Sequence, residues 1–254
     1  MFAALDPEAA AALRASMDTV SLNKGQVLFN EGDRGERLYI ITDGKMKLGH
    51  TSKDGRESLL AVLGPGELLG ELSLFDPGPR TATATALTET SLMGLGHGAL
   101  RPWLTGRPEV AEALLQALAQ RLRRTNEQMA DLVFSDVPGR VAKTLLELGE
   151  KFGRPLPDGI HVTHDMTQEE LAQLVGASRE TVNKALADFA ARGWIRLESR
   201  SVILIDPERL DRRSMCPEPE LSLWFDRHRR VARYSNCART LSNANGHTAC
   251  GTSA

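Results

Sequence analysis

Cysteine is absent from the first 215 residues of this 254-residue chain. Its three cysteines all lie near the end, at Cys216, Cys237 and Cys250. The body of the protein therefore lacks the residues of a disulfide scaffold, a cysteine nucleophile or an iron–sulfur cluster. His228 and His247 lie among the three cysteines, but the spacing fits no familiar zinc module, and we expect no metal site and no bound cofactor there.

The chain also lacks an apolar run of the roughly 18 residues that cross a membrane, and its start lacks the basic flank and apolar segment of an export signal. We therefore expect a cytoplasmic protein with no membrane partner. The formal net charge is only -2, so nucleic-acid binding would require a local basic surface. A composition of 41% hydrophobic and 25% charged residues predicts a soluble globular protein, long enough for two modest domains.

Short β-prone runs fill residues 20–95, and glycine interrupts them about every ten residues. Regular punctuation of this kind is typical of an antiparallel sandwich or barrel. Asp43-Gly44 and Asp54-Gly55 each precede an apolar run, and both dipeptides are strong signals for a β-hairpin. We expect a small antiparallel β-roll.

The β pattern fails at residues 70–82, GELSLFDPGPRTA. A Gly-Glu pair opens a single helical turn, and Arg80 and Thr81 lead into the next strand. An arginine makes paired, charge-assisted hydrogen bonds to phosphate, and a buried carboxylate such as Glu71 can accept from sugar hydroxyls. Two interpretations stay open: an anion-binding pocket, or a Glu71–Arg80 salt bridge that only fixes the loop to the β-roll.

Residues 107–134 predict one helix of about seven turns. Apolar or small residues follow one face at Leu114, Leu118, Leu122, Thr125, Met129 and Leu132. The opposite face is polar, with Glu112, Gln116, Gln120, Arg123, Arg124 and Glu127. An amphipathic core helix is one interpretation. We prefer a dimerisation helix that joins two domains, because the stripe runs the whole length and divides segments of different character.

A turn is predicted at Asp136–Gly139, with a hinge near Ser135. A helix over residues 140–151 and a loop over residues 153–159 should follow it, and residues 160–162 could form a short strand.

Residues 167–189 carry the most specific pattern in the sequence. Thr167 with Glu170 fits a capping box, Gly176 permits a tight turn, and Ser178 can cap a second helix. This second helix buries Val182, Leu186 and Phe189 and projects polar residues outward: Arg179, Glu180, Asn183 and Lys184. The pattern predicts a helix-turn-helix, although a two-helix packing unit with a solvated face is the alternative.

In such motifs the start of the second helix meets base edges in the major groove. Arg179 can pair bidentately with guanine, and Glu180 can accept from the amino group of cytosine. Past Gly193, residues 194–205 predict a hairpin that turns at Ser199-Arg200-Ser201, which would form a wing. Positive charge for DNA phosphates could come from Lys184, Arg192, Arg196 and Arg200.

The chain resembles the cyclic-AMP receptor protein and fumarate-nitrate regulator superfamily over about residues 2–212, and is most similar to actinobacterial cyclic-AMP receptor proteins. The segments that carry the resemblance are GELSLFDPGPRTA, RLRRTNEQMADLVFSDVPGRVAKTLL and residues 167–189. The resemblance implies that cyclic AMP binds a phosphate cassette made of Gly70, Glu71, Leu72, Arg80 and Thr81. Glu71 would hold the ribose, and Arg80 and Thr81 the cyclic phosphate.

By the same resemblance, Thr125 and Asn126 meet the adenine, with Asn126 reaching across a homodimer. Some relatives carry serine at the second of these positions. Arg179, Glu180 and Lys184 match base-reading positions, which implies TGTGA-like half-sites in an inverted repeat. The full expected DNA-contacting set is Thr167, Gln168, Ser178, Arg179, Glu180, Asn183, Lys184 and Arg200.

The expected fold class is α+β. Its parts are a cyclic-nucleotide-binding β-roll (1–106), a dimerisation helix and hinge (107–135), a winged helix-turn-helix (136–213) and a disordered tail (214–254). The implied function is a cyclic-AMP-responsive transcription regulator that activates or represses promoters, with RNA polymerase as a further partner. A same-architecture regulator of another effector, such as a redox or heme sensor, is the first alternative. An enzyme that turns over the nucleotide is less favoured, because no paired carboxylate or activated nucleophile lies near the cassette.

Overall fold

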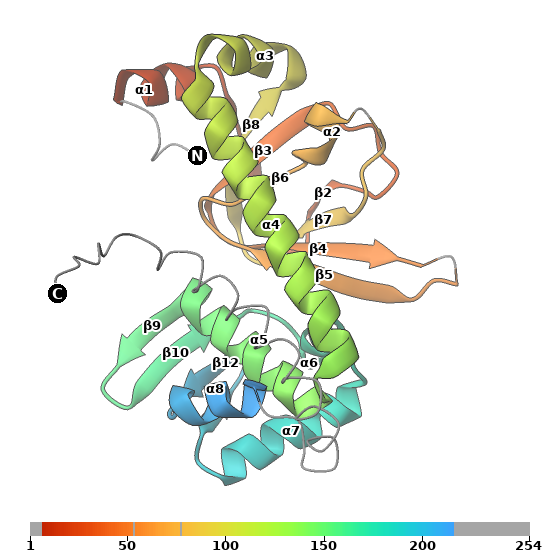
Figure 1. Ribbon diagram of the computed structural model, residues 1–254, viewed down its shortest axis with the longest axis vertical. Helices are drawn as coiled ribbons and strands as arrows, with labels where there is room; N and C mark the ends of the chain where they lie inside the picture. The colour runs from red at the N-terminus through yellow and green to blue at the C-terminus, as the bar shows by residue number, and fades with distance from the viewer. Residues whose placement is uncertain (1–6, 53, 77, 216–254) are drawn as a thin grey trace, which may run out of the picture. The chain divides into compact units, whose positions relative to one another are not determined.

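The computed structural model describes residues 7–52, 54–76 and 78–215. Of the tail expected at 214–254, residues 216–254, which include the three cysteines, lie outside the described residues. Within the described part, a β-roll is followed by a long helix and then by a smaller α+β domain (Figure 1). The α+β fold class is confirmed. No described helix is both long and apolar enough to cross a membrane.

The β-roll consists of two four-stranded antiparallel sheets. Their strands are β1 (Asp18–Leu22), β2 (Val27–Phe29), β3 (Arg37–Asp43), β4 (Met46–Thr51), β5 (Glu57–Leu63), β6 (Leu68–Leu69), β7 (Thr83–Ala86) and β8 (Thr90–Gly96). One sheet has the order β1-β8-β3-β6 and the other β2-β7-β4-β5. Side chains alternate as strand geometry requires: Ala84 and Ala86 are buried while Thr83 and Thr85 are half-buried.

The two predicted hairpin turns have different outcomes. Asp54-Gly55 joins β4 to β5, which pair from Met46–Leu63 to Thr51–Glu57, so this hairpin is confirmed. Asp43-Gly44 does not close a hairpin, because β3 pairs with β8 and β6 whereas β4 belongs to the other sheet. The turn instead carries the chain between sheets. Gly44 has a φ of 84°, and an added Cβ would lie 2.3 Å from the Glu89 carbonyl oxygen.

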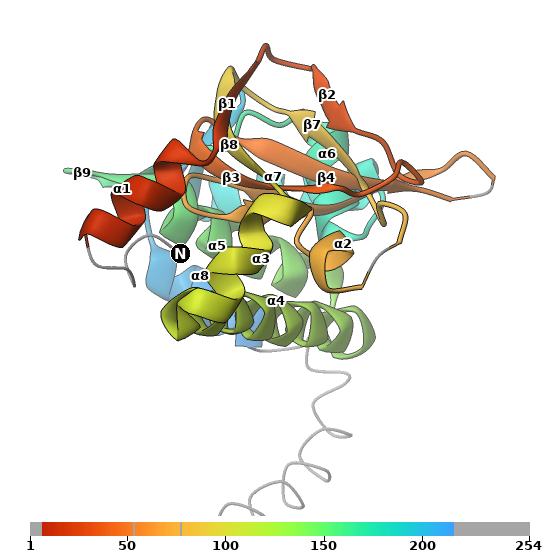
Figure 2. The same cartoon turned by 90° about the horizontal axis from the view of Figure 1, so that it is seen from above.

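Three helices cover the outer side of the first sheet: α1 (Pro7–Ala15), α3 (His97–Gly106) and the start of α4 (Pro108–Phe134) (Figure 2). Leu13, Leu100, Val110 and Leu114 form one buried cluster with residues of β3 and β8. The first turns of α4 are therefore anchored to the β-roll. The remainder of α4 has no buried residue.

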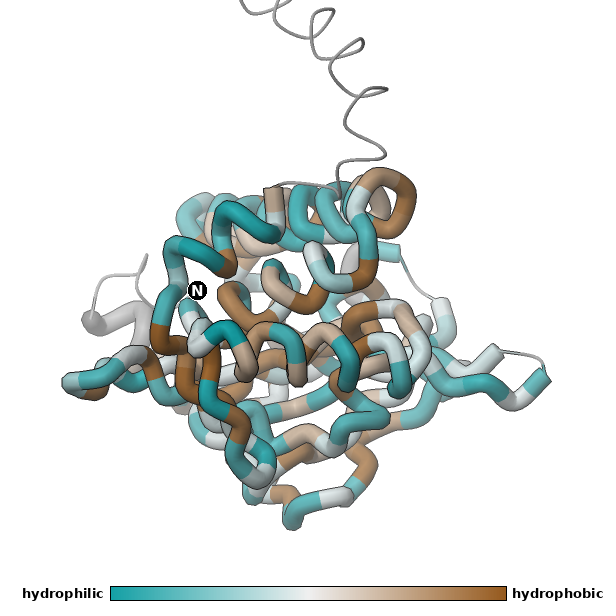
Figure 3. Tube along the Cα trace, turned by 90° about the horizontal axis from the view of Figure 1, so that it is seen from below, coloured by the Kyte–Doolittle hydropathy of each residue, from teal (hydrophilic) through white to brown (hydrophobic). Residues whose placement is uncertain are grey.

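The second domain begins with α5 (Val137–Phe152) and continues with β9 (Gly153–Leu156), β10 (Gly159–Thr163), α6 (Gln168–Val175), α7 (Arg179–Ala191), β11 (Ile195–Glu198), β12 (Ser201–Leu204) and α8 (Pro207–Met215). The sheet order is β11-β12-β10-β9. Hydrophobic and hydrophilic residues alternate along its helices (Figure 3), and Val182, Leu186 and Phe189 of α7 point into its core, as predicted.

Three boundaries in this domain differ from expectation. The predicted turn at Asp136–Gly139 is the start of α5, because the Asp136 side chain accepts from the Gly139 amide at 2.9 Å and caps the helix. The predicted loop at 153–159 contains β9, which pairs with β10. The last helix, α8, runs two residues past the predicted end of the domain at residue 213.

Candidate functional sites

Arg80 is the buried cation of the first candidate site. The residue is 6% exposed, and its guanidinium donates to the Gly70 carbonyl at 3.0 Å, to Ser73 Oγ at 3.3 Å and to the Arg37 carbonyl at 2.7 Å. The same group lies 4.3 Å from the centre of the Phe29 ring. Burial lowers the pKa of Arg80 from its ordinary value. The Nε atom of the guanidinium is buried and has no hydrogen-bond partner, so one donor is left unsatisfied.

Gly70 is required by this arrangement. Its φ is +74°, and an added Cβ would lie 2.2 Å from Arg80 Nη1. Any larger residue at position 70 would displace the guanidinium.

Glu71 is the buried anion of the site, only 2% exposed. Its Oε1 accepts from Nη1 of Arg121 on α4, while Oε2 is buried with no partner. The Glu71–Arg80 salt bridge considered above is therefore not formed, since Glu71 pairs with α4 instead. Leu72 and Thr81 complete the predicted cassette, and both are exposed. The site is a pair of opposite charges, each with one unsatisfied polar atom.

Arg121 is the functional candidate that sequence reasoning missed. It lies one helical turn before Thr125, whose hydroxyl donates to the Arg121 carbonyl at 3.0 Å. This four-residue spacing is the signal by which the sequence could have identified Arg121, because residues four apart share a helix face. Thr125 and Asn126 are both exposed, and within the described part of the chain neither side chain hydrogen-bonds the cassette.

The helix-turn-helix has the local geometry that its sequence predicts. Thr167 Oγ1 accepts from the Glu170 amide at 3.2 Å, and the Glu170 carboxylate accepts from the Thr167 amide at 2.7 Å, which completes the capping box. Gly176 ends α6 with a φ of 70°, and the Ser178 hydroxyl accepts from the Thr181 amide at 3.2 Å. These caps fix the angle at which α7 starts.

The exposed face of this motif presents most of the predicted DNA-contacting residues. Those with exposed side chains are Thr167, Gln168, Ser178, Arg179, Glu180, Lys184 and Arg200. Asn183 is half-buried, and its Oδ1 is buried without a partner. Arg192 and Arg196 are each engaged in an ion pair, to Asp188 at 2.8 Å and Asp158 at 2.7 Å. Much of their charge is therefore already compensated.

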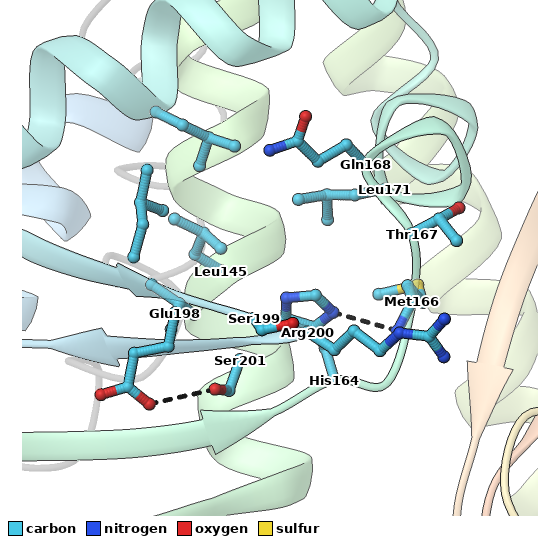
Figure 4. Close-up of a pocket in the computed structure, with 13 residues that line it drawn as sticks. Leu145, His164, Met166, Thr167, Gln168, Leu171, Glu198, Ser199, Arg200 and Ser201 are labelled. Carbon is cyan, nitrogen blue, oxygen red and sulfur yellow. Dashed lines mark hydrogen bonds between the residues drawn. The ribbon is translucent and has the colours of Figure 1, made fainter.

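A cavity of about 240 Å³ lies behind this face, between α6, α7 and the β11–β12 wing (Figure 4). His164 projects into it, and its Nδ1 accepts from the Met166 amide at 3.1 Å. Burial lowers the pKa of His164 from 6.5 to about 4. The imidazole is therefore neutral at physiological pH and acts as a structural acceptor. No group of three or more potential metal ligands occurs among the described residues.

A β-roll that carries two buried charges with unsatisfied polar atoms, joined by a long helix to a winged helix-turn-helix, is the arrangement of a ligand-sensing DNA-binding regulator. Comparison with known proteins agrees. Residues 19–105 match the model of the cyclic nucleotide-binding domain, and residues 139–213 match that of the Crp-like helix-turn-helix domain.

A CRP-like cAMP-activated global transcriptional regulator of Mycobacterium tuberculosis is 56% identical over 214 residues, which is 84% of this chain and 96% of that protein. A cyclic AMP receptor protein of Thermus thermophilus is 39% identical over 174 residues, 68% of this chain and 77% of that one. The chain belongs to the cyclic AMP receptor protein family.

Solved structures agree on the fold. The c-di-GMP-responsive regulator CLP of Xanthomonas campestris superposes with a TM-score of 0.68 at 26% identity, covering 78% of this chain and 99% of that one. A CRP-family transcriptional regulator of Thermus thermophilus gives a TM-score of 0.67 at 27% identity, covering 78% of this chain and 97% of that one. The family and fold class expected from the sequence are thus confirmed, while the individual site residues stay predictions.

The buried neutral imidazole predicts a pH-dependent stability. As the pH falls from about 6.5 to about 4, the unfolded chain binds a proton that folded His164 does not, so the free energy of unfolding should fall by roughly 2–3 kcal/mol. His164→Asn keeps an acceptor for the Met166 amide and cannot titrate. Urea unfolding of both proteins at several pH values measures the difference. If the free energy of unfolding changed with pH in the same way in both proteins, His164 would not be the source of the pH dependence.

Proposed function

We propose that this protein is a cyclic-AMP-controlled transcription regulator that works as a homodimer on palindromic DNA in the cytoplasm. The observation that supports it best is that one chain combines two buried charged side chains, Arg80 and Glu71, each with an unpartnered polar atom, and an exposed helix-turn-helix face. The protein acts by binding rather than by catalysis. It activates or represses promoters, and RNA polymerase is a further partner.

The pocket favours a molecule that carries an anion beside hydroxyl groups. Arg80 Nε can donate to a phosphate oxygen, and Glu71 Oε2 can accept from a sugar hydroxyl. Each buried polar atom left without a partner costs about 1–3 kcal/mol, and a cyclic nucleotide satisfies both. The matched domain model and the names of the curated relatives favour cyclic AMP. Gly70, Leu72 and Thr81 complete the phosphate cassette.

The exposed part of α4 supports dimerisation. Leu115, Leu122 and Met129 are 64%, 62% and 62% exposed in the single chain and recur every seven residues. A seven-residue apolar repeat pairs two helices in a left-handed coiled coil. Leu114 belongs to the stripe that the sequence predicts, but it is 1% exposed and packs on the β-roll instead. The pairing seam therefore begins at Leu115, and it presents Thr125 and Asn126 to the ligand and the second subunit.

A dimer of this kind places two α7 helices about one DNA turn apart, roughly 34 Å, on an inverted repeat of TGTGA-like half-sites. Arg179, Glu180 and Lys184 read the bases. Thr167, Gln168, Ser178, Asn183 and Arg200 hold the backbone of each half-site. Cyclic AMP controls DNA binding by preferring one arrangement of the helix pair.

Arg80→Gln should weaken cyclic AMP binding by at least about 100-fold, because the charge and the fork are both lost. Isothermal titration calorimetry with cyclic AMP, cyclic GMP and c-di-GMP measures the effect and the selectivity. Arg34→Gln removes an arginine whose side chain is 89% exposed and should bind as the parent does. Undiminished cyclic AMP binding by a folded Arg80→Gln protein would count against the pocket.

Leu122→Lys should shift the protein to a monomer, because each subunit of the proposed dimer would then place one lysine charge in the middle of the apolar seam. Sedimentation velocity at several concentrations measures the association. Gln120→Lys adds the same charge on the polar face of α4 and should leave the dimer intact. A parental chain that is monomeric with and without nucleotide would contradict the dimeric mechanism.

Arg179→Ala should relax base preference at one symmetric position of the operator by about 1–3 kcal/mol. Binding to a library of operator variants at saturating cyclic AMP measures the profile. Arg209→Ala removes an exposed arginine on α8, which is paired with Asp206, and serves as the control. An unchanged profile for Arg179→Ala would mean that α7 does not read these bases as proposed.

A further inference from the structure

Two lysines of the β-roll point out of the sheet toward the winged helix. Lys45 and Lys47 flank Met46 at the start of β4, and because side chains alternate along a strand, both lie on the face opposite the buried Met46. On the neighbouring strand Val62 pairs with Lys47 and is buried in one cluster with residues of the DNA-binding domain. Helix α6 packs directly against β5. This face of the β4–β5 hairpin is therefore a contact surface between the domains.

The partners of these lysines flank the start of α6. Lys45 Nζ donates to the Asp165 carboxylate at 2.6 Å and to the Thr163 carbonyl, and it lies 4.8 Å from the centre of the Phe152 ring. Lys47 Nζ donates to Glu170 Oε1 at 2.6 Å. All four charged side chains are mostly shielded, with Lys45 14% and Lys47 30% exposed. Ion pairs shielded to this degree are screened less by salt than those on the surface.

Each acceptor also orders a residue of the DNA-contacting set. The Asp165 amide donates to the carbonyl of Arg200 at the wing turn, at 3.1 Å. Asp165 and Arg200 are the two non-glycine residues with positive φ in the described part of the chain, at 61° and 58°. This conformation is uncommon outside glycine, so it persists only where neighbouring contacts hold it. The Asp165–Arg200 hydrogen bond and the Lys45 ion pair are such contacts.

Glu170 has the corresponding double role on α6. One carboxylate oxygen accepts from Lys47, while the other accepts from the amide and hydroxyl of Thr167 in the capping box. Burial raises the pKa of Glu170, but the bonds from Lys47 and Thr167 outweigh it and the net shift is downward. The carboxylate is thus held ionised in a position where it serves both partners.

We infer that Lys45 and Lys47 are positioning residues for DNA binding: through Asp165 and Glu170 they hold the wing turn at Arg200 and the α6 cap at Thr167 in the geometry that meets DNA phosphates. This inference rests on the proposed function. Arg200 and Thr167 are exposed, so the lysines do not block the DNA face and act by ordering it. Ordering before binding reduces the entropy lost when DNA is bound.

The test uses the full-length protein with Lys45→Met, Lys47→Met and the double substitution, each of which keeps an unbranched chain without the charge. At saturating cyclic AMP the double variant should bind operator DNA about tenfold more weakly than the parent. Its affinity for cyclic AMP should be unchanged, because neither lysine contacts the cassette. Lys24→Met removes an exposed lysine of the same β-roll and is the matched control. Lys45→Arg with Lys47→Arg should restore most of the affinity.

Amide hydrogen exchange reports the positioning itself. The Asp165 amide should exchange faster in Lys45→Met, and the Thr167 amide faster in Lys47→Met, without a general rise across the β-roll. DNA affinity equal to that of Lys24→Met, tighter DNA binding, or unchanged exchange at both amides would each overturn the inference. A parental protein that binds no palindromic DNA would defeat the proposed function instead, and the exchange rates would still decide whether the lysines order the two segments.

Discussion

The link between the β-roll and the long helix α4 depends most on one buried carboxylate, that of Glu71. Glu71 sits 2% exposed, with one oxygen held by Arg121 of α4 and the other without a partner. A charge removed from water is tolerated only when hydrogen bonds and opposite charge replace the lost hydration. The pairing to Arg121 supplies part of this and fixes α4 to the cassette. Under the proposed function, a ligand that hydrogen-bonds to the second oxygen would act on the same carboxylate that pairs with α4, which would couple ligand binding to the position of that helix.

The seven turns of α4 serve two surfaces, and this explains why its sequence pattern is ambiguous. Val110 and Leu114 pack on the β-roll, whereas Leu115, Leu122 and Met129 stay exposed. Leu114 and Leu115 are adjacent in sequence but about 100° apart around the helix. A single apolar stripe drawn through Leu114 therefore merges the intramolecular anchor with the seam proposed to pair two subunits. The amphipathic pattern predicts the helix correctly but does not reveal which of its faces meets which partner.

The sequence predicts local structure well here and contacts between distant segments poorly. Thr167, Gly176 and Ser178 act on their own neighbours within a few residues, and they predict the helix-turn-helix with its caps in place. The Asp43-Gly44 turn is predicted correctly, but its hairpin is not, since the pairing of β3 with β8 is decided by the packing of whole sheets. Arg121 with Glu71 spans 50 residues, and Lys47 with Glu170 spans 123. The residue spacings that predict helices and turns cannot predict ion pairs between residues so far apart in the sequence.

Under the proposed mechanism, the free energy needed to switch the molecule explains why subunit pairing and interdomain contacts would both be required. Moving a two-state equilibrium from 1:99 to 99:1 requires a differential affinity of about 10⁴-fold, or about 5.5 kcal/mol. One charge-assisted hydrogen bond contributes about 1.5–3 kcal/mol, so the single ligand contact proposed at Glu71 Oε2 would fall short. In the proposed dimer, two identical ligand sites acting on one helix pair would multiply their preferences, and about 100-fold at each would then be sufficient. The ligand's preference for one arrangement of the α4 helices can change DNA binding only if α7 is held in a defined orientation to α4. Ion pairs that cross the hinge contribute to this: Lys143 of α5 pairs with Asp131 of α4, and Lys45 and Lys47 pair with Asp165 and Glu170 around the start of α6.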